Sequence, residues 1–295
     1  MPDSARGSFI VSAAVCLSFA VGCGTPGNVI DRYFLKSPGP PKTSPADLGL
    51  VYEDVRFPSL NGYQLAGWFV PAAGGEPLAT VLVHTGMQGN LDTYLPMVPW
   101  AASDFNVLIY SWQGFGASEG ESDFSNFEPD TRAAVEYLLS RPGADRGIIQ
   151  LGASLGAVPA MAAAANYPDQ TIGLILYGGA FLEDIPSMWL ATQITPLLWP
   201  IGRVGDHVWA AILPDFFDAH RYLDSIRVPI LAVTAEDDET VPVPAQMALY
   251  GALPEPKQLY LTYGGHLHAV ETDGELAGVV VEWAKAVVVG RPAQR

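Results

Sequence analysis

The sequence predicts an α/β protein in which a mostly parallel sheet of eight strands is flanked by helices. Short apolar runs recur along the chain, and most of them lack alternation, which is typical of strands buried on both faces of a parallel sheet. Helical segments separate the later runs, and the dipeptide Asn61-Gly62 marks a hairpin turn between the first two. We expect strands at residues 51–58, 64–70, 80–84, 106–110, 147–151, 172–177, 229–234 and 258–262.

Helices are expected between and after these strands. Residues 129–140 begin with a proline and an acidic residue, which suit the first turn of a helix, and carry apolar residues at helical spacing. An alanine-rich run follows at 157–165, and residues 275–289 form the last expected helix. This alternation of strands and helices predicts one α/β domain.

The composition argues against several classes of protein. With 49% hydrophobic and 16% charged residues, the 295-residue chain can build a large core, so global disorder is not expected. Its formal net charge of −16 argues against nucleic-acid binding, which needs basic surface. The two cysteines, Cys16 and Cys23, lie near the N-terminus, so the body of the protein has neither a disulfide nor a thiolate metal site.

The N-terminal segment has the pattern of a secretion signal. The apolar run from Phe9 to Val21 is too short to span a bilayer but fits the hydrophobic region of a signal peptide. The run ends in Ala20-Val21-Gly22-Cys23, which resembles a bacterial lipoprotein signal. This resemblance implies that residues 1–22 are removed and that Cys23 is acylated. The alternatives are an ordinary secretory signal and an uncleaved anchor.

The lipoprotein interpretation predicts where the protein acts. The uncharged Gly24 after the cysteine resembles the signal for outer-membrane retention in diderm bacteria, which implies a protein of the cell envelope that faces the periplasm. Residues 23–47 are rich in proline and glycine and are expected to tether the membrane anchor to a folded domain at 48–295.

The G-x-S-x-G stretch Gly152-Ala153-Ser154-Leu155-Gly156 lies between an expected strand and an expected helix. In that context the pattern forms a nucleophile elbow. The sharp turn strains the serine backbone and exposes its hydroxyl, while the flanking glycines let strand and helix pass closely. The N–H of Leu155 then faces the atom that Ser154 attacks. The alternative is a glycine-rich turn without chemistry.

A serine nucleophile needs a base and an acid, and the late strands supply candidates for both. Of the five histidines, His266 and His268 follow a late strand, and two glycines before His266 allow its loop to bend over the elbow. The acidic run of Glu236, Asp237 and Asp238 follows the preceding strand, which gives the chain order serine, acid, histidine. No convincing set of metal ligands surrounds these histidines in the sequence, so no metal is expected.

In these motifs the sequence resembles the α/β-hydrolase family, in particular its compact lipases, esterases and serine-aminopeptidase-like members. Ala235-x-x-Asp238-x-x-Val241-Pro242 resembles the family's G-x-x-D-x-x-V-P, and Gly265-His266 matches its G-H. The resemblance covers roughly residues 50–290 and implies the α/β-hydrolase fold with a catalytic triad of Ser154, Asp238 and His266.

Two loops extend the resemblance. Residues 84–90 resemble the loop that gives the second oxyanion N–H; because Thr85 is inserted before the glycine, the donor is either Met87 or Gly86. Residues 114–120 resemble the family's G-[FY]-G-x-S-x-G loop. Before this loop, Ser111-Trp112-Gln113 stands where the family usually has Asp-Tyr-Arg or a similar triplet. Any salt bridge made by the aspartate and arginine of that triplet is therefore absent.

A small cap is expected between the sixth and seventh strands, where the apolar and aromatic residues of 185–217 lie. These residues either form an acyl or aromatic pocket over Ser154 or simply pack helices on the sheet edge.

The resemblance implies a monomeric serine hydrolase that cleaves small-molecule or lipid carboxylic esters through an acyl-enzyme, without any cofactor. The alternatives are a serine peptidase or amidase acting on short peptides, and a catalytically silent protein of the same fold that binds an envelope ligand.

Overall fold

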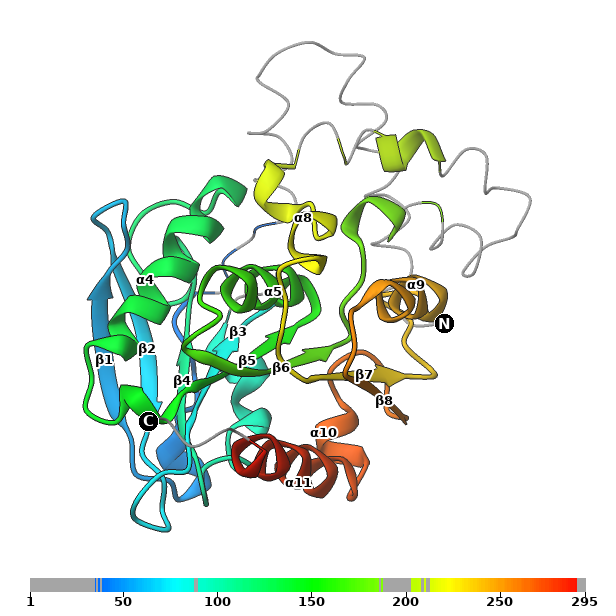
Figure 1. The fold of residues 1–295 in the computed structure, drawn as a ribbon. Coiled ribbons are helices and arrows are strands. Elements are labelled where there is room, and N and C mark those ends of the chain that lie inside the picture. Colours follow the sequence, from blue (N-terminus) through cyan, green and yellow to red (C-terminus); the bar gives the residue numbers. More distant parts are fainter. Residues whose placement is uncertain are drawn as a thin grey trace.

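Figure 1 shows the computed structural model, in which one twisted sheet runs through the molecule with helices on both of its faces. The structure describes residues 35, 37, 39–87, 90–185, 187, 203–207, 210 and 213–290. Its strands are β1 (Glu53–Pro58), β2 (Gln64–Val70), β3 (Thr80–His84), β4 (Asn106–Tyr110), β5 (Ile148–Ala153), β6 (Thr171–Tyr177), β7 (Ile230–Ala235) and β8 (Lys257–Thr262). All eight expected strands are confirmed, each within two residues of its predicted bounds.

The strand order of the sheet is β1-β2-β4-β3-β5-β6-β7-β8. The predicted hairpin is present, because β1 pairs with β2 in antiparallel register. β2 also pairs antiparallel with β4, and every pair from β4 to β8 is parallel. Parallel strands share one carboxyl edge, so the loops that follow β3, β5, β6, β7 and β8 meet at the same side of the sheet.

The helices are α3 (Leu91–Tyr94), α4 (Phe127–Leu139), α5 (Ala157–Asn166), α8 (His220–Leu223), α9 (Val243–Ala252), α10 (Ala269–Thr272) and α11 (Leu276–Val289). The helices expected near 129–140, 157–165 and 275–289 are confirmed as α4, α5 and α11. The sequence reasoning did not single out α9, which begins directly after Pro242 and carries a proline in its first turn.

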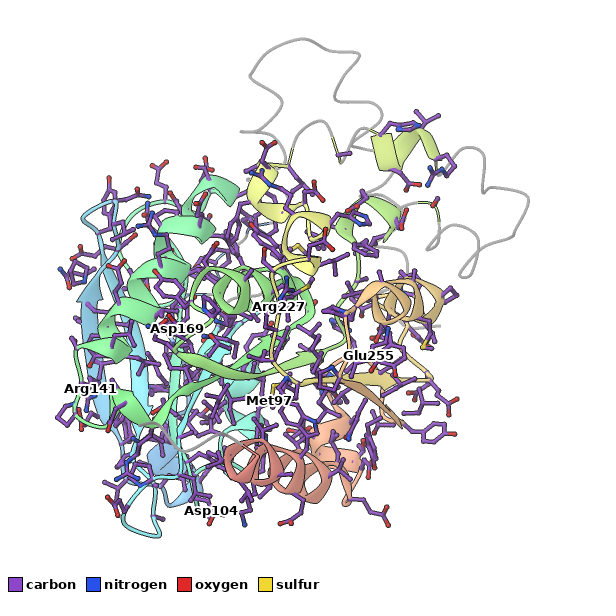
Figure 2. The ribbon with its side chains drawn as sticks, in the orientation of Figure 1. Met97, Asp104, Arg141, Asp169, Arg227 and Glu255 are labelled. Atoms are coloured by element: carbon purple, nitrogen blue, oxygen red, sulfur yellow. The ribbon has the colours of Figure 1, made fainter. Side chains whose placement is uncertain are left out.

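Each face of the sheet has its own apolar core. On one face α4, α5 and α9 pack against the strands, and α5 is buried on nearly all sides, which accounts for its alanine-rich sequence. On the other face α11 packs against the central strands together with the segment around Met97, which lies between the sheet and the helix layer (Figure 2). Strands covered on both faces carry apolar residues without alternation, as the sequence pattern predicted.

Contacts between the N-terminal segment and the domain begin before residue 48, where the domain boundary was predicted. The Leu35 side chain is about 2% exposed and belongs to the core on the α4 and α5 face. The backbone N–H groups of Lys42 and Thr43 donate to the carboxylate of Asp92, at 2.6 and 3.3 Å. This part of the predicted tether therefore packs on the domain, while the predicted signal peptide and Cys23 lie outside the described residues.

Two further observations concern the predicted cap and the membrane. Most of residues 185–217 lie outside the described part of the chain, so the predicted cap stays a prediction. In the part that the structure describes, no helix combines the length and the apolar composition that a membrane span requires.

Candidate active site

Ser154 lies at a sharp turn between β5 and α5. Its φ of 56° makes it the one non-glycine residue with positive φ in the described part of the chain. A serine in this region of φ and ψ costs about 1–3 kcal/mol and persists only when the surroundings impose it. The surroundings do so here, because a Cβ on Gly152 would lie 2.6 Å from the Cα of Ala157 and one on Gly156 would overlap the His84 carbonyl. The predicted nucleophile elbow is therefore present as backbone geometry.

The loop after β3 passes directly over this serine. A Cβ on Gly86 would lie 3.0 Å from the Cβ of Ser154, so only glycine allows the approach. The N–H of Gly86 donates to the buried hydroxyl of Tyr94 at 2.8 Å. Of the two donors that the sequence left open, Gly86 is thus already engaged within the protein, and Met87 is the one that remains.

Asp238 follows β7 and is held by a dense set of hydrogen bonds. Its Oδ1 accepts from the backbone N–H groups of Thr240 and Val241, at 2.8 and 2.9 Å. Its Oδ2 accepts from Gln246 Nε2 at 2.8 Å and lies 2.7 Å from His266 Nδ1. The side chain is only 1% exposed, and these four donors compensate for the burial of the carboxylate.

The loop that carries His266 follows β8 and bends at two glycines. Gly264 and Gly265 have φ values of 118° and 73°, which side-chain-bearing residues rarely adopt. The N–H groups of both glycines donate to the carboxylate of Asp237, with N to O distances of 3.0–3.2 Å. Backbone hydrogen bonds, that of Gly265 first, hold the pKa of Asp237 below its ordinary value. The neighbouring aspartates therefore have separate tasks: Asp238 contacts the imidazole, and Asp237 fixes the loop.

The sheet register brings the serine and the histidine to one place. Ala153 on β5 pairs with Tyr177 on β6, so Ser154 and Gly178 each directly follow one of these paired strand ends. A Cβ on Gly178 would lie 3.0 Å from His266 Cε1, which shows that the imidazole packs against this glycine. Loops that are remote in sequence thus converge at the carboxyl edge of the sheet and bring Ser154, Asp238 and His266 to the same region.

The acid and the base of the predicted triad are in contact, but the link to the serine is not formed. His266 Nε2 is buried and has no hydrogen-bond partner among the described residues. With Nδ1 bound to the carboxylate, Nε2 is the nitrogen available to accept a proton. Catalytic hydrogen bonds are often long in ligand-free enzymes and tighten when substrate binds.

A second buried histidine supports the oxyanion loop. His84 is the last residue of β3; its Nε2 lies 2.9 Å from Gln150 Oε1, and its Nδ1 lies 3.1 Å from the hydroxyl of Tyr110. Burial lowers the pKa of His84 to about 4, and the hydrogen bond to Gln150 only partly opposes this. The ring is therefore neutral near pH 7, and its two hydrogen bonds hold the start of the loop that follows β3.

The segment of residues 111–113, which departs from the family pattern, contacts a buried carboxylate through the backbone of Gln113. Asp130, on α4, is fully buried and accepts hydrogen bonds from the Ser59 hydroxyl at 2.5 Å and the Gln113 N–H at 2.7 Å. In the part of the chain that the structure describes, no ion pair involves this carboxylate. Burial raises the pKa of Asp130 to about 6. The two hydrogen bonds lower this pKa but do not outweigh the effect of burial.

Sequence reasoning missed several residues that shape the site. Tyr94 and Gln246 belong to no motif; Gln246 lies among mostly apolar residues of α9, and Tyr94 ends the short α3. Gly178 follows a strand in Gly178-Gly179, a doublet that signals a turn but not what packs against it. Asp237 was weighed as a rival to Asp238, and no sequence signal indicates that its partners are backbone N–H groups.

The strand order, the serine turn after β5 and the aspartate and histidine loops after β7 and β8 are those of the α/β-hydrolase fold. Comparisons with known proteins support this class. Residues 75–209 match a family model described as "Serine aminopeptidase, S33". The chain is also 29% identical over 252 residues to the "Alpha/beta hydrolase domain-containing protein WAV2" of Arabidopsis thaliana, covering 81% of this chain and 79% of that protein. The chain therefore has the α/β-hydrolase fold and is similar in sequence to a protein of that class.

The chain is also similar to a bacterial protein in sequence and to solved structures in fold. The chain is 29% identical over 233 residues to the uncharacterized protein YfhR of Salmonella typhimurium, covering 74% of this chain and 75% of that protein. An esterase from Pyrococcus furiosus, Pf2001, has a similar fold, with a TM-score of 0.66 at 20% identity over 86% of this chain and 98% of that one. Est1E from Butyrivibrio proteoclasticus, solved with ferulic acid bound, gives a TM-score of 0.61 at 16% identity over 81% and 99% of the two chains.

Proposed function

We propose that this α/β hydrolase is a serine hydrolase that cleaves carboxylic esters of a lipid or a small acyl group. The observation that carries the proposal is the contact of 2.7 Å between His266 Nδ1 and Asp238 Oδ2, placed beside a serine held at positive φ. A buried carboxylate that fixes one imidazole nitrogen leaves the other free to act as a base. The esterases with a similar fold add support for the class of reaction.

The proposed reaction proceeds through a covalent intermediate. Ser154 Oγ attacks the ester carbonyl carbon while His266 Nε2 takes the hydroxyl proton. The imidazolium, stabilised by Asp238, returns this proton to the leaving alkoxide as the bond from carbon to oxygen breaks. Water then gives a proton to His266 and attacks the acyl-enzyme, and the imidazolium returns that proton to Ser154 Oγ as the carboxylic acid leaves. Each proton is thus returned, and the enzyme is regenerated unchanged.

Backbone N–H groups of Leu155 and Met87 are the proposed donors to the oxyanion. Leu155 follows the serine in the first turn before α5, where the N–H points toward the attacked carbonyl. Met87 is favoured over Gly86 because the Gly86 N–H already donates to Tyr94. Removing one such donor typically lowers kcat by about 10²–10³.

A serine peptidase or amidase is the second candidate, because the matching family model carries the description of a serine aminopeptidase. The same triad chemistry serves esters and amides, so the fold does not choose between them. Parallel assays on p-nitrophenyl esters and aminoacyl anilides separate the two. Faster turnover of the anilides would favour the peptidase.

Labelling by a fluorophosphonate tests the nucleophile directly. We expect the wild-type protein to be labelled on Ser154 and the Ser154→Ala variant to stay unlabelled. A wild-type protein that is neither labelled nor active on any of these substrates would instead be a silent binding protein of the same fold.

We also propose that the mature protein is anchored in the cell envelope by lipid on Cys23. The proposal rests on the short apolar run before Ala20-Val21-Gly22-Cys23. More than one acyl chain, at about 0.8 kcal/mol per buried CH₂, gives stable attachment. Wild type should incorporate radiolabelled palmitate and fractionate with membranes, whereas Cys23→Ala should not. Label that persists on the variant, or a wholly soluble wild type, would contradict this.

A further inference from the structure

Gln246 contacts the same carboxylate oxygen as the proposed base. It lies on α9, and its side chain is buried beneath the loop that carries Asp238. Its Nε2 donates to Asp238 Oδ2 at 2.8 Å and to the backbone carbonyl of Val241 at 2.9 Å. Asp238 Oδ2 therefore receives two hydrogen bonds, one from this amide and one from the imidazole of His266.

The orientation of this amide is fixed by its partners. A carboxylate and a carbonyl both accept hydrogen bonds, so only the NH₂ end of Gln246 can face them. The other end, Oε1, is buried and has no hydrogen-bond partner in the described part of the chain. An unpaired buried carbonyl costs about 1–3 kcal/mol, so a glutamine at this position needs compensating contacts at its NH₂ end. The hydrogen bond to Asp238 is one such contact.

We infer that Gln246 is a positioning residue that holds Asp238 Oδ2 against His266. Its hydrogen bond also reduces the electrostatic stabilisation that this oxygen gives to the protonated imidazole. The inference rests on the proposed function, in which His266 is the base. A donor to a carboxylate spreads its negative charge, so that the charge left to stabilise a neighbouring cation is smaller. Gln246 would then set the pH below which the enzyme loses its base.

Other titratable groups around the imidazole are unchanged by a substitution at position 246. The loop before His266 is held by Asp237, and the hydroxyl of Tyr177 on β6 lies nearby with its pKa raised by burial. On the far side, His268 and Glu271 form an exposed pair at 3.9 Å. Among the described residues, the hydrogen bonds of the Gln246 side chain go to Asp238 and Val241, so a shift of the pH profile in a Gln246 variant reports on Asp238.

Two substitutions at this position should move the pH profile in opposite directions. Gln246→Met has a similar volume but no donor, and we expect the acid limb of kcat/KM on a p-nitrophenyl ester to move to higher pH by about 0.5–1 unit. Gln246→Lys keeps a donor and adds a positive charge, so the limb should move to lower pH. The rate on the alkaline plateau of the methionine variant should fall by less than about tenfold, because the two backbone donors to Oδ1 remain.

Leu249→Ala is the matched control. Leu249 lies on the same helix in the apolar core, about 2% exposed, so its truncation destabilises α9 without touching the carboxylate. We expect a lower melting temperature and an unmoved acid limb for this variant. If Gln246 were merely structural, Gln246→Met would behave in the same way.

The outcomes separate this inference from the proposed function. A wild-type protein without ester hydrolysis and without fluorophosphonate labelling overturns the proposed function and this inference together. An active wild type whose profile superimposes on that of Gln246→Met overturns the inference alone. The methionine variant decides by itself if the lysine variant does not fold.

Discussion

Replacing Asp130 with asparagine is expected to stabilise the protein, and more strongly at alkaline than at acidic pH. Asp130 is fully buried, and its two hydrogen bonds come from a neutral hydroxyl and a backbone N–H. Each neighbour keeps a partner in the variant: asparagine Oδ1 can accept from the Gln113 N–H, and Nδ2 can donate to the Ser59 hydroxyl oxygen, which reverses the direction of that hydrogen bond. The substitution removes a buried charge without leaving either neighbour unpaired.

The magnitude follows from linkage between proton binding and folding. Burial raises the pKa of Asp130 from its ordinary 3.8 to about 6. The folded state therefore holds the proton more tightly, so stability falls as pH rises from 3.8 through 6 and stays reduced above that range. This difference in pKa lowers the free energy of unfolding of the wild type by about 3 kcal/mol at pH 8 and by about half of that at pH 5, and Asp130→Asn should recover these amounts.

Urea unfolding of wild type and Asp130→Asn at pH 8 and pH 5 measures this difference. Other titrating groups, including His84, contribute equally to both proteins and cancel in the comparison. Ser59→Ala, which removes one hydrogen-bond donor to Asp130, should instead be destabilising. An asparagine variant that is less stable than wild type at pH 8, or a gain that does not change with pH, would refute the reasoning.

The remaining predictions concern the site and the N-terminal segment. Ser154→Ala should abolish ester hydrolysis with an unchanged melting temperature, and residual turnover above about one part in a thousand would indicate another nucleophile. Asp238→Asn should lower kcat by about 10⁴, as the corresponding change does in serine proteases. Asp237→Asn should lower kcat far less, because asparagine keeps an acceptor for the glycine N–H groups. The reverse order in steady-state assays would show that the acid is misassigned. Gly178→Ala should lower kcat/KM, because the new methyl lies 3.0 Å from His266 Cε1, and should also lower the melting temperature, because Gly178 has a φ of 63° that alanine rarely adopts; an active variant with wild-type kcat/KM would contradict this. Leu35→Ala should cost about 2–3 kcal/mol in urea unfolding; no loss would mean that this segment is only a tether.

The strands and the serine elbow were determined by the sequence alone. Apolar runs without alternation indicate strands buried on both faces, and the structure has each of the eight within two residues of its expected place. Gly152 and Gly156 flank Ser154 in a G-x-S-x-G pattern between an expected strand and an expected helix, which predicts the strained turn at the serine. These features are local, since each depends on residues within one strand or one turn.

The selection of contacts at the site was decided only by the tertiary structure. The sheet register places Ser154 beside Gly178, and Gly178 beside His266, across more than a hundred residues of chain. Sequence placed Asp237 and Asp238 side by side, and only the packing of α9 and the bend at Gly265 give one the imidazole and the other the loop backbone. Hydrogen bonds between remote segments depend on distance and direction in space, which no spacing along the chain encodes.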